Sequence, residues 1–218
     1  MSGSGTHGKS AEGQDGAPGA RPVLDRQRVG NLASILRMYR LGFYPYFERR
    51  TERFYWDIQG SRSFIPVTVQ TLAKARRLAR SVKQDLRFAF SEHTTAVLQL
   101  LSDDAIKPET WVRGPVLDVY EALLAEKRLV TFEILRKGEI VGATLCVHNE
   151  PVLHAETMFS SVDGASKLAL VHTVEYALSQ DLHTIDVQVA HPKGHPVSRL
   201  GEVTCGLDDY LERFRTVD

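Results

Sequence analysis

Residues 151–188 contain two short apolar runs on either side of a helical pattern, and this order constrains the fold more than any other feature of the chain. Apolar residues alternate over 152–159 and again over 184–189, which is the period of a β-strand. Between these runs, after a turn at Asp163-Gly164, apolar residues recur at helical spacing. A strand, a crossover helix and a second strand predict a βαβ unit with a parallel strand pair.

Three polar residues lie inside this apolar unit and are the first candidates for a functional site. Glu156 lies in the middle of the first predicted strand, whereas Asp186 and Gln188 share one face of the second. Burying two carboxylates and an amide costs free energy unless something uses them. Structural roles are the alternative, because Asp186 could cap a neighbouring helix and Glu156 could pair with Lys167.

The segment before this unit predicts an antiparallel meander. Residues 129–135 and 140–147 read as strands joined by a turn at 137–139, and residues 148–151 turn into the strand at 152. The resulting α+β order resembles the GNAT acyltransferase fold, which is built around acetyl-coenzyme A. Residues 161–166 (SVDGAS) do not match the pyrophosphate-binding pattern that those enzymes carry before the crossover helix. Coenzyme A is therefore disfavoured, and we expect no cofactor.

Composition limits the class of protein. The chain has 218 residues, 43% of them hydrophobic, which suffices for one large domain or two small ones sharing a core. Its 27 basic and 27 acidic residues balance, so nucleic-acid binding would have to rest on a local patch. Cys146 and Cys205 show neither pairing nor metal-ligand spacing, which fits a reducing, cytoplasmic setting. No run reaches the length of a membrane span, and we expect no signal peptide and no membrane partner.

The N-terminal half is expected to form a helical and aromatic subdomain. Residues 1–22 are rich in Gly, Ser, Ala and charge, so we interpret them as a disordered tail. The subdomain would span 23–110 and the GNAT-like domain 111–218. Helices are predicted over 31–40, 91–101, 115–125 and 208–215.

An aromatic cluster at 43–56 follows the first helix and is expected to surround a loop at Pro45. It could be a small core, or a platform on which a nucleobase or an aromatic amino acid stacks. Its candidate residues are Tyr44, Tyr46 and Trp56. Trp111, in the turn between two later helices, likewise fits either a core or the wall of a pocket.

Residues 70–87 are the clearly basic stretch of the chain. At helical spacing, four cations fall on one face, and Asp85 is the single acid between residues 71 and 87. A solvated helix face is the usual explanation of such a run. A row of unpaired cations also suits a phosphate backbone, because released counterions drive binding. The candidate residues for contact with a phosphate backbone are Arg76, Arg80, Lys83 and Arg87.

Several ordered motifs resemble the leucyl/phenylalanyl-tRNA–protein transferases. The strand-helix-strand unit carries ETMFS at 156–160, ASK at 165–167, and Ile185, Asp186 and Gln188, which look like the signature of that family. Residues 42–47 (GFYPYF) are similar to its Gly-Ile-Phe-Pro-Trp-Phe, and 110–112 (TWV) match its Thr-Trp-Ile. Trp56 falls where the family has a tryptophan pair, and 198–201 (SRLG) loosely match its Ser-Leu-Gly. These motifs occur in the family's order and at similar spacing.

The resemblance implies an aminoacyltransferase that moves Leu or Phe, and possibly Met, from an aminoacyl-tRNA to the α-amine of a protein N-terminal Arg or Lys. Such an enzyme makes a destabilising N-terminus read by a bacterial degradation adaptor, as part of an N-degron pathway. We expect a monomer. Alternatives are a diverged transferase with another amine acceptor, or a non-catalytic module that binds tRNA or peptide.

The resemblance also implies residue roles, and it identifies Arg76, Arg80, Lys83 and Arg87 as tRNA-binding residues. Asp186 would take a proton from the attacking amine, directly or through Gln188, and Gln188 would orient the amine or donate to the ester carbonyl. Glu156 would pair with the cationic side chain of the acceptor. Either His191 or His195 could stand for the family's histidine, and we take His195, which is nearer to Ser198 and Gly201, as a second acceptor-binding residue. The donor side chain would occupy an apolar slot lined by Trp111, Thr144, Met158, Val174 and Ile185.

Residues 189–201 differ most from the family, because the segment is longer and has no asparagine. His191 and His195 are four residues apart, but the prolines and glycine between and around them preclude a helix, and no third ligand is evident. We therefore expect no metal site.

An Asp186→Ala change separates the catalytic interpretation from a binding module. Removing the proton acceptor should abolish aminoacyl transfer and leave tRNA binding almost intact, as measured by peptide mass and by tRNA affinity. Undiminished transfer would contradict the catalytic assignment of Asp186.

Overall fold

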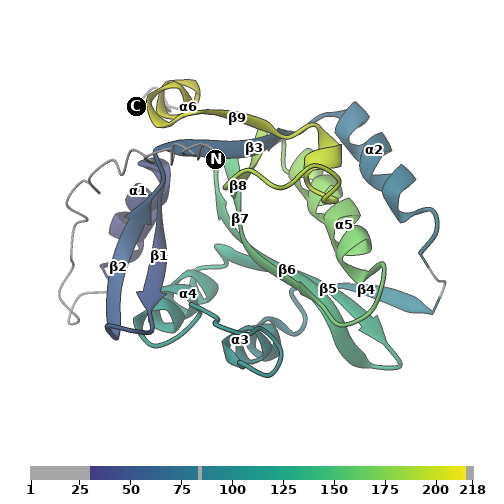
Figure 1. The fold of residues 1–218 in the computed structure, drawn as a ribbon, viewed down its shortest axis with the longest axis horizontal. Helices are drawn as coiled ribbons and strands as arrows, with labels where there is room; N and C mark the ends of the chain where they lie inside the picture. Colours follow the sequence, from purple (N-terminus) through teal and green to yellow (C-terminus); the bar gives the residue numbers. More distant parts are fainter. Residues whose placement is uncertain (1–29, 83–84, 215–218) are drawn as a thin grey trace, which may run out of the picture.

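A computed structural model describes residues 30–82 and 85–214, and a mixed seven-stranded sheet forms its centre (Figure 1). The order across the sheet is β4-β5-β6-β7-β8-β3-β9. The bounds are β3 Ser61–Pro66, β4 Leu86–Phe90, β5 Leu129–Arg136, β6 Glu139–Asn149, β7 Val152–Ser160, β8 Thr184–Gln188 and β9 Val203–Gly206. A separate antiparallel pair consists of β1 (Phe43–Glu48) and β2 (Arg53–Ile58).

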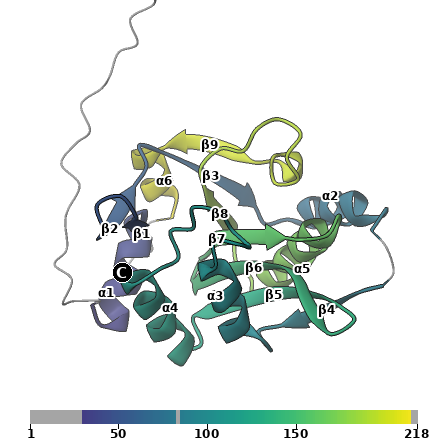
Figure 2. The same cartoon turned by 60° about the horizontal axis from the view of Figure 1, so that its bottom comes forward.

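Helices cover both faces of the large sheet, as the two ribbon views show (Figures 1 and 2). On one face α5 packs against β5, β6 and β7, and α2 packs on α5. On the other face α3 and α4 pack against β5, and α1 lies against α4 and β6. The helices are α1 Leu32–Arg40, α2 Val69–Ala79, α3 Thr94–Ser102, α4 Pro115–Ala125, α5 Ala165–Ser179 and α6 Leu207–Arg213, with a short 3-10 turn η1 at Ser198–Leu200.

The predicted α+β, GNAT-like order is confirmed. Strands β5, β6 and β7 form an antiparallel meander, α5 crosses over, and β8 returns parallel to β7. The first helix begins where expected, because the Asn31 side chain accepts the Ser34 N–H at 3.0 Å and caps it. None of the helices in the described ranges is long and apolar enough to cross a bilayer.

Two expectations about the secondary structure of the N-terminal half were wrong. The aromatic stretch is a β-hairpin, not a loop around Pro45, and Pro45 pairs with Trp56 inside it. A two-stranded sheet has only edge strands, where a proline with no N–H is tolerated. The basic helix ends at Ala79 rather than near residue 87, and residues 86–90 instead pair with β5 at the edge of the sheet as β4. Arg87 therefore lies on a strand, and Lys83 lies outside the described residues.

The expected subdomain boundary at 110/111 does not separate the sheet. Strands β3 and β4 precede it, yet β3 pairs with β8 and β9, and β4 pairs with β5. The expected disordered tail, residues 1–22, lies outside the described residues, as does Arg215 at the end of the last predicted helix.

Gly142 on β6 lets α5 approach the sheet closely. A Cβ at this position would lie 2.8 Å from the Cβ of Ala165, the first residue of α5, and 3.3 Å from the Phe159 carbonyl oxygen. Real Cβ atoms are not found that close, so the helix would have to move away from the strand.

We expect Gly142→Ala to lower the free energy of unfolding by about 1–3 kcal/mol, the usual cost of overpacking, as measured by urea denaturation. Gly60→Ala is the matched control, because a Cβ at Gly60 meets nothing within 4 Å. Equal stability of the two variants would contradict the proposed close contact between β6 and α5.

Candidate active site

Glu156 projects from an irregularity in β7. In the ladder with β6, Leu145 pairs with Thr157 and Cys146 pairs with Ala155, so Glu156 is the extra residue of a β-bulge. Its carboxylate is buried, and the Tyr120 hydroxyl of α4 donates to Oε2 at 3.0 Å. Bulges re-aim side chains beside functional sites, and this one turns Glu156 towards the face covered by α4.

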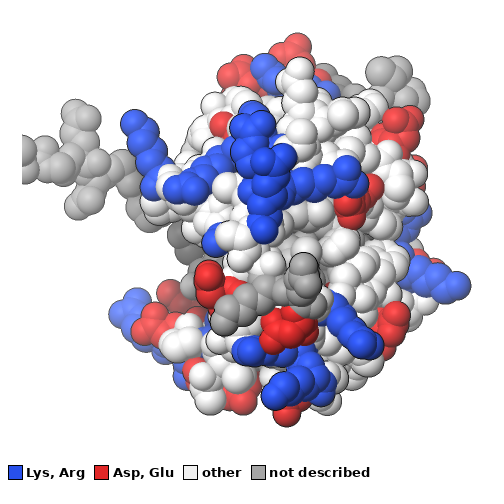
Figure 3. All heavy atoms as spheres, turned by 90° about the vertical axis from the view of Figure 1, so that its right-hand side faces the viewer, with Lys and Arg blue, Asp and Glu red and all other residues white. Residues whose placement is uncertain are grey.

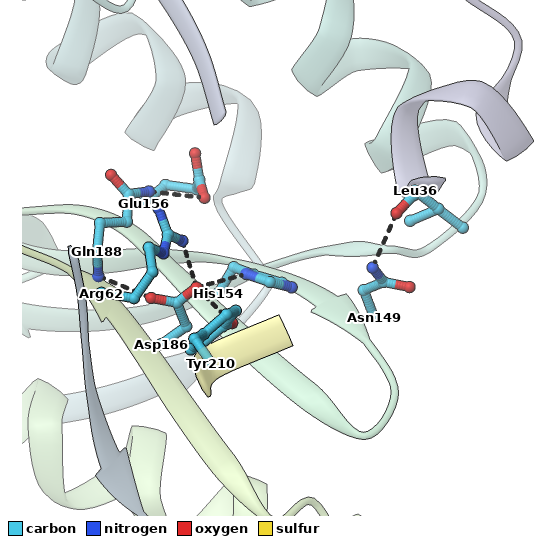
Figure 4. A network of polar contacts seen from close by, with 8 residues as sticks. All are labelled: Leu36, Arg62, Asn149, His154, Glu156, Asp186, Gln188 and Tyr210. Carbon is cyan, nitrogen blue, oxygen red and sulfur yellow. Dashed lines mark hydrogen bonds and ion pairs between the residues drawn. The ribbon is translucent and has the colours of Figure 1, made fainter. Parts of the chain in front are cut away.

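Gln188 reaches Glu156 across the point where β7 and β8 separate. Within the described residues, the parallel ladder consists of three pairs and ends at His154 opposite Asp186. Two residues further on, Gln188 Nε2 donates to Glu156 Oε1 at 3.1 Å, so the two side chains bridge the separating strands (Figure 4). Gln188 has a left-handed backbone, with φ of 64°, and Asp186 Oδ1 accepts its backbone N–H at 2.8 Å. Asp186 thus holds the strained residue in place.

Asp186 itself is fully buried and surrounded by donors. Its Oδ2 forms an ion pair with the Arg62 guanidinium, accepts the Tyr210 hydroxyl at 2.7 Å and lies 3.2 Å from His154 Nδ1 (Figure 4). Burial alone would raise the pKa of this carboxyl, but the Arg62 charge and then the His154 ring outweigh burial and lower the pKa well below its usual range. Asp186 is therefore ionised at neutral pH and is held by structural partners.

Glu156 has the opposite electrostatic environment. Burial raises its pKa from an ordinary value of 4.5 to about 7, and the hydrogen bond from Tyr120 offsets only part of this effect. A carboxyl with a pKa near neutrality can take up and release a proton under ordinary conditions. The two buried acids therefore suit different tasks: Glu156 suits proton transfer, and Asp186 suits positioning.

Four residues of this network were missed by the sequence analysis: Arg62, Tyr120, His154 and Tyr210. Arg62 gave one weak signal, as a single cation beside the apolar residues of 61–66. Tyr210 and Tyr120 lie on amphipathic helices, where an aromatic residue reads as core. The carboxylates that accept their hydroxyl groups are Asp186 and Glu156, which are 24 and 36 residues away along the chain. Only the folded structure brings these pairs together.

The five residues expected to line the donor slot fall into two groups. Met158, Val174 and Ile185 belong to the apolar cluster under α5, and Thr144, which pairs with Met158, is buried beside them. Trp111 belongs instead to the cluster on the α1 and α4 face. Met158, Val174 and Ile185 therefore lie on the α5 face of the sheet, whereas Trp111 lies on the face towards which Glu156 is turned.

The candidate aromatic residues divide between core and surface. Tyr44 and Trp56 are buried, and the Tyr44 hydroxyl donates to Asp57 Oδ2 at 2.8 Å, as the core interpretation requires. Tyr46 is half-buried and stacks with Trp111, with ring centroids 6.2 Å apart. Trp111 also meets the ring of Tyr120 edge-on at 6.3 Å, which links this aromatic pair to Glu156.

The basic residues of α2 lie on the same side of the sheet as α5. Lys and Arg side chains gather over the end of the molecule that carries α2 (Figure 3). Arg80 is exposed directly after α2, and Arg87 is exposed on β4. Arg76 is not an unpaired cation, since its Nη2 lies 2.8 Å from Glu175 Oε1 of α5. This partner is almost a hundred residues away in sequence, so counting nearby acids could not find it.

His195 lies in a cluster of its own. Its ring stacks on His191 at 4.5 Å, and His191 Nδ1 lies 3.0 Å from Glu202 Oε1. Within the described part of the chain, no hydrogen bond joins His195 to Glu156 or Gln188. Among the same residues, no three His, Cys, Asp or Glu side chains are grouped so that they could hold a metal ion.

Known proteins resemble this chain over most of its length. Residues 67–215 match the family model of leucyl/phenylalanyl-tRNA protein transferase. The leucyl/phenylalanyl-tRNA–protein transferase of Paramagnetospirillum magneticum is 30% identical over 158 residues, covering 71% of this chain and 74% of that protein. The Vibrio campbellii protein of the same name is 25% identical over 180 residues, covering 83% and 74%. A solved structure of FemX has a similar fold, with a TM-score of 0.56 at 10% identity, covering 80% of this chain and 66% of that one.

The Arg62–Asp186 ion pair predicts a strong effect on stability. Arg62→Met leaves a buried carboxylate without its counter-charge and should lower the free energy of unfolding by about 3–5 kcal/mol. The same reasoning applies to Asp186→Ala, which leaves Arg62 unpaired, so loss of activity in that variant needs a folding control.

The double variant Arg62→Met/Asp186→Asn should lose much less stability than the sum of the two single changes, as measured by urea denaturation at pH 7. Strictly additive losses would show that the two side chains are not coupled.

Folding lowers the pKa of Asp186, so the contribution of Asp186 to the free energy of unfolding is present at neutral pH and is lost as the pH falls towards its folded-state pKa. Asp186→Asn should not show this loss of stability as the pH falls.

Proposed function

This chain belongs to the leucyl/phenylalanyl-tRNA–protein transferase family, and we propose that it moves Leu or Phe from an aminoacyl-tRNA to the α-amine of a protein N-terminal Arg or Lys. Membership makes it an aminoacyltransferase whose substrates are an aminoacyl-tRNA and a protein. We propose further that the donor amino acid is Leu or Phe, that the acceptor residue is Arg or Lys, and that the protein is a monomer. Methionine is a third possible donor.

The observation that supports this function most directly is the Glu156–Gln188 bridge between β7 and β8. An aminoacyl ester is already activated, so the reaction needs a neutral amine, a proton acceptor and correct placement of both substrates. The amine nitrogen attacks the ester carbonyl, the new C–N bond forms, and the C–O bond to the tRNA ribose breaks. The ammonium proton passes to the enzyme, and the leaving ribose oxygen is protonated.

We assign proton acceptance to Glu156 and orientation of the amine to Gln188. The Gln188 amide donates to Glu156 and can also accept an N–H of the amine, which places the attacking nitrogen beside the carboxylate. Asp186 acts indirectly, by holding the Gln188 backbone through its N–H. Asp186 is less suited to take the proton itself, because Arg62, Tyr210 and His154 already occupy its Oδ2.

The alternative role of Glu156, pairing with the cationic side chain of the acceptor, is less favourable. The carboxyl is buried with a pKa of about 7, and the positive charge of Arg62 acts on it. A second guanidinium or ammonium group would have to be desolvated beside that existing cation.

The proposed function is tested by incubating the protein with Leu-tRNA or Phe-tRNA and peptides that begin with Arg, Lys or Ala. Mass spectrometry should find one added Leu or Phe on the Arg and Lys peptides and none on the Ala peptide. An N-acetylated Arg peptide is the control, because its amine is blocked. Bound tRNA with no addition to any peptide would contradict the transferase assignment and favour a binding module.

The role of Glu156 predicts a specific pH dependence. With Phe-tRNA and an Arg peptide, kcat/KM should rise as Glu156 ionises at pH about 7 and as the amine deprotonates near pH 8. Glu156→Gln should lower kcat/KM by roughly 100-fold or more and remove the inflection near pH 7. If the variant instead keeps the inflection and loses its preference for Arg over Ala peptides, Glu156 binds the acceptor side chain.

Stability provides the control for this variant. Folding raises the pKa of Glu156, so its burial lowers wild-type stability as the pH rises from the unfolded value of 4.5 to about 7. Glu156→Gln removes that penalty, and the variant should be at least as resistant to urea as the wild type at pH 8. A loss of activity at pH 8 is then a chemical effect.

A further inference from the structure

Lys107 is a half-buried cation in the connection between α3 and α4. Its ammonium group donates to the Thr157 hydroxyl of β7, and burial lowers the pKa of the lysine. Lysine is seldom buried without a charged partner, because removing an ammonium from water is costly. This position therefore calls for an explanation.

No carboxylate of the described residues forms an ion pair with Lys107. Three acids lie within four residues of Lys107 along the chain. Asp104 pairs with Arg49 and Arg113, and Asp103 Oδ1 accepts the Ala105 N–H at 2.9 Å. Glu109 is exposed to solvent and forms no ion pair with the Lys107 ammonium. The neutral Thr157 hydroxyl satisfies one donor of the ammonium and none of its charge. The chain thus holds a positive charge at this place that lacks an anion.

This charge lies beside the proposed reaction site. Thr157 follows Glu156 directly in the β7 bulge, where two successive residues oppose one on the partner strand. The same α3–α4 connection carries Trp111, which contacts Tyr46 and Tyr120, and Tyr120 donates to Glu156. One connection therefore places a cation on the residue that follows Glu156 and an aromatic ring against Tyr120, the donor to Glu156.

We propose that Lys107 binds a backbone phosphate at the 3′ end of the aminoacyl-tRNA while the aminoacyl ester lies at Glu156 and Gln188. The inference rests on the proposed function, since that function brings a polyanion to this site. A phosphate supplies the missing anion, and a neighbouring aromatic ring suits the base of the same strand. The contact fixes the position of the ester relative to the attacking amine. It is separate from the basic surface of α2, which lies on the other face of the sheet.

The test compares two donors that differ in their phosphates. One is a phenylalanyl ester of the trinucleotide CCA, which has internucleotide phosphates, and the other is phenylalanyl-adenosine, which has none. Lys107→Gln should lower kcat/KM for the trinucleotide donor by roughly tenfold and leave kcat/KM for phenylalanyl-adenosine unchanged. Lys107→Arg should restore most of the loss, because it keeps the charge.

Lys127→Gln is the matched control, since it removes the same charge from an exposed position at the end of α4. It should use both donors as the wild type does. An equal loss of kcat/KM with both donors in Lys107→Gln would show a merely structural role and would overturn the proposal. An unchanged kcat/KM for the trinucleotide donor would also overturn it.

A binding measurement keeps the inference independent of catalysis. The affinity for uncharged CCA trinucleotide is measured at several salt concentrations, with no acceptor present. Loss of one phosphate contact should reduce the slope of log affinity against log salt by about 0.7 in Lys107→Gln. An unchanged slope would overturn the phosphate contact. The wild type could also show a slope about 0.7 larger than that of Lys107→Gln and still transfer no amino acid. That result would refute the proposed function and would support the contact between Lys107 and a phosphate.

Discussion

The ion pair between Arg62 and Asp186 is the interaction on which the central part of this structure depends. It joins β3 to β8 inside the sheet, and the same carboxylate receives the Tyr210 hydroxyl from α6 and faces His154 of β7. Four elements from distant parts of the sequence therefore meet on one buried oxygen. A buried ion pair is expensive to desolvate and is weak support for stability by itself. Its benefit here is geometric, because Asp186 also holds the left-handed backbone of Gln188.

Two buried acids a short distance apart acquire different chemistry from their surroundings. Asp186 has a cation, a hydroxyl and an imidazole as partners and stays ionised. Glu156 has a hydroxyl and an amide, and burial brings its pKa to about 7. The side chains are similar, so the difference comes from the neighbours. The β7 bulge and the separation of β7 from β8 place Glu156 and Gln188 together, where an ester and an amine can be brought into line.

The charges that suit a nucleic acid are local, as the balanced composition requires. Exposed arginines gather over α2 on one face of the sheet, and Lys107 lies singly beside the reaction site on the other. An exposed cation such as Arg80 steers and retains a polyanion in a salt-dependent way. A half-buried cation such as Lys107 is better suited to fixing one phosphate, because it has already lost much of its hydration. In the proposed interface, the exposed arginines therefore attract the tRNA as a whole, and Lys107 fixes one phosphate at the reaction site.

The sequence by itself determined the α+β order, the βαβ unit, the bounds of α4, and the set of Glu156, Asp186 and Gln188. These depend on periodicity and on polar residues inside apolar runs, which are local properties. Strands β3 and β9 were not predicted, because short edge or mixed-polarity strands gain their stability from partners elsewhere in the chain. The roles of the acids also needed the fold: Arg62 is 124 residues from Asp186, and Glu175 is 99 residues from Arg76. Only the tertiary structure decides which charges meet. The pKa of a buried acid depends on its burial and on its distance from other charges, and spacing along the sequence determines neither.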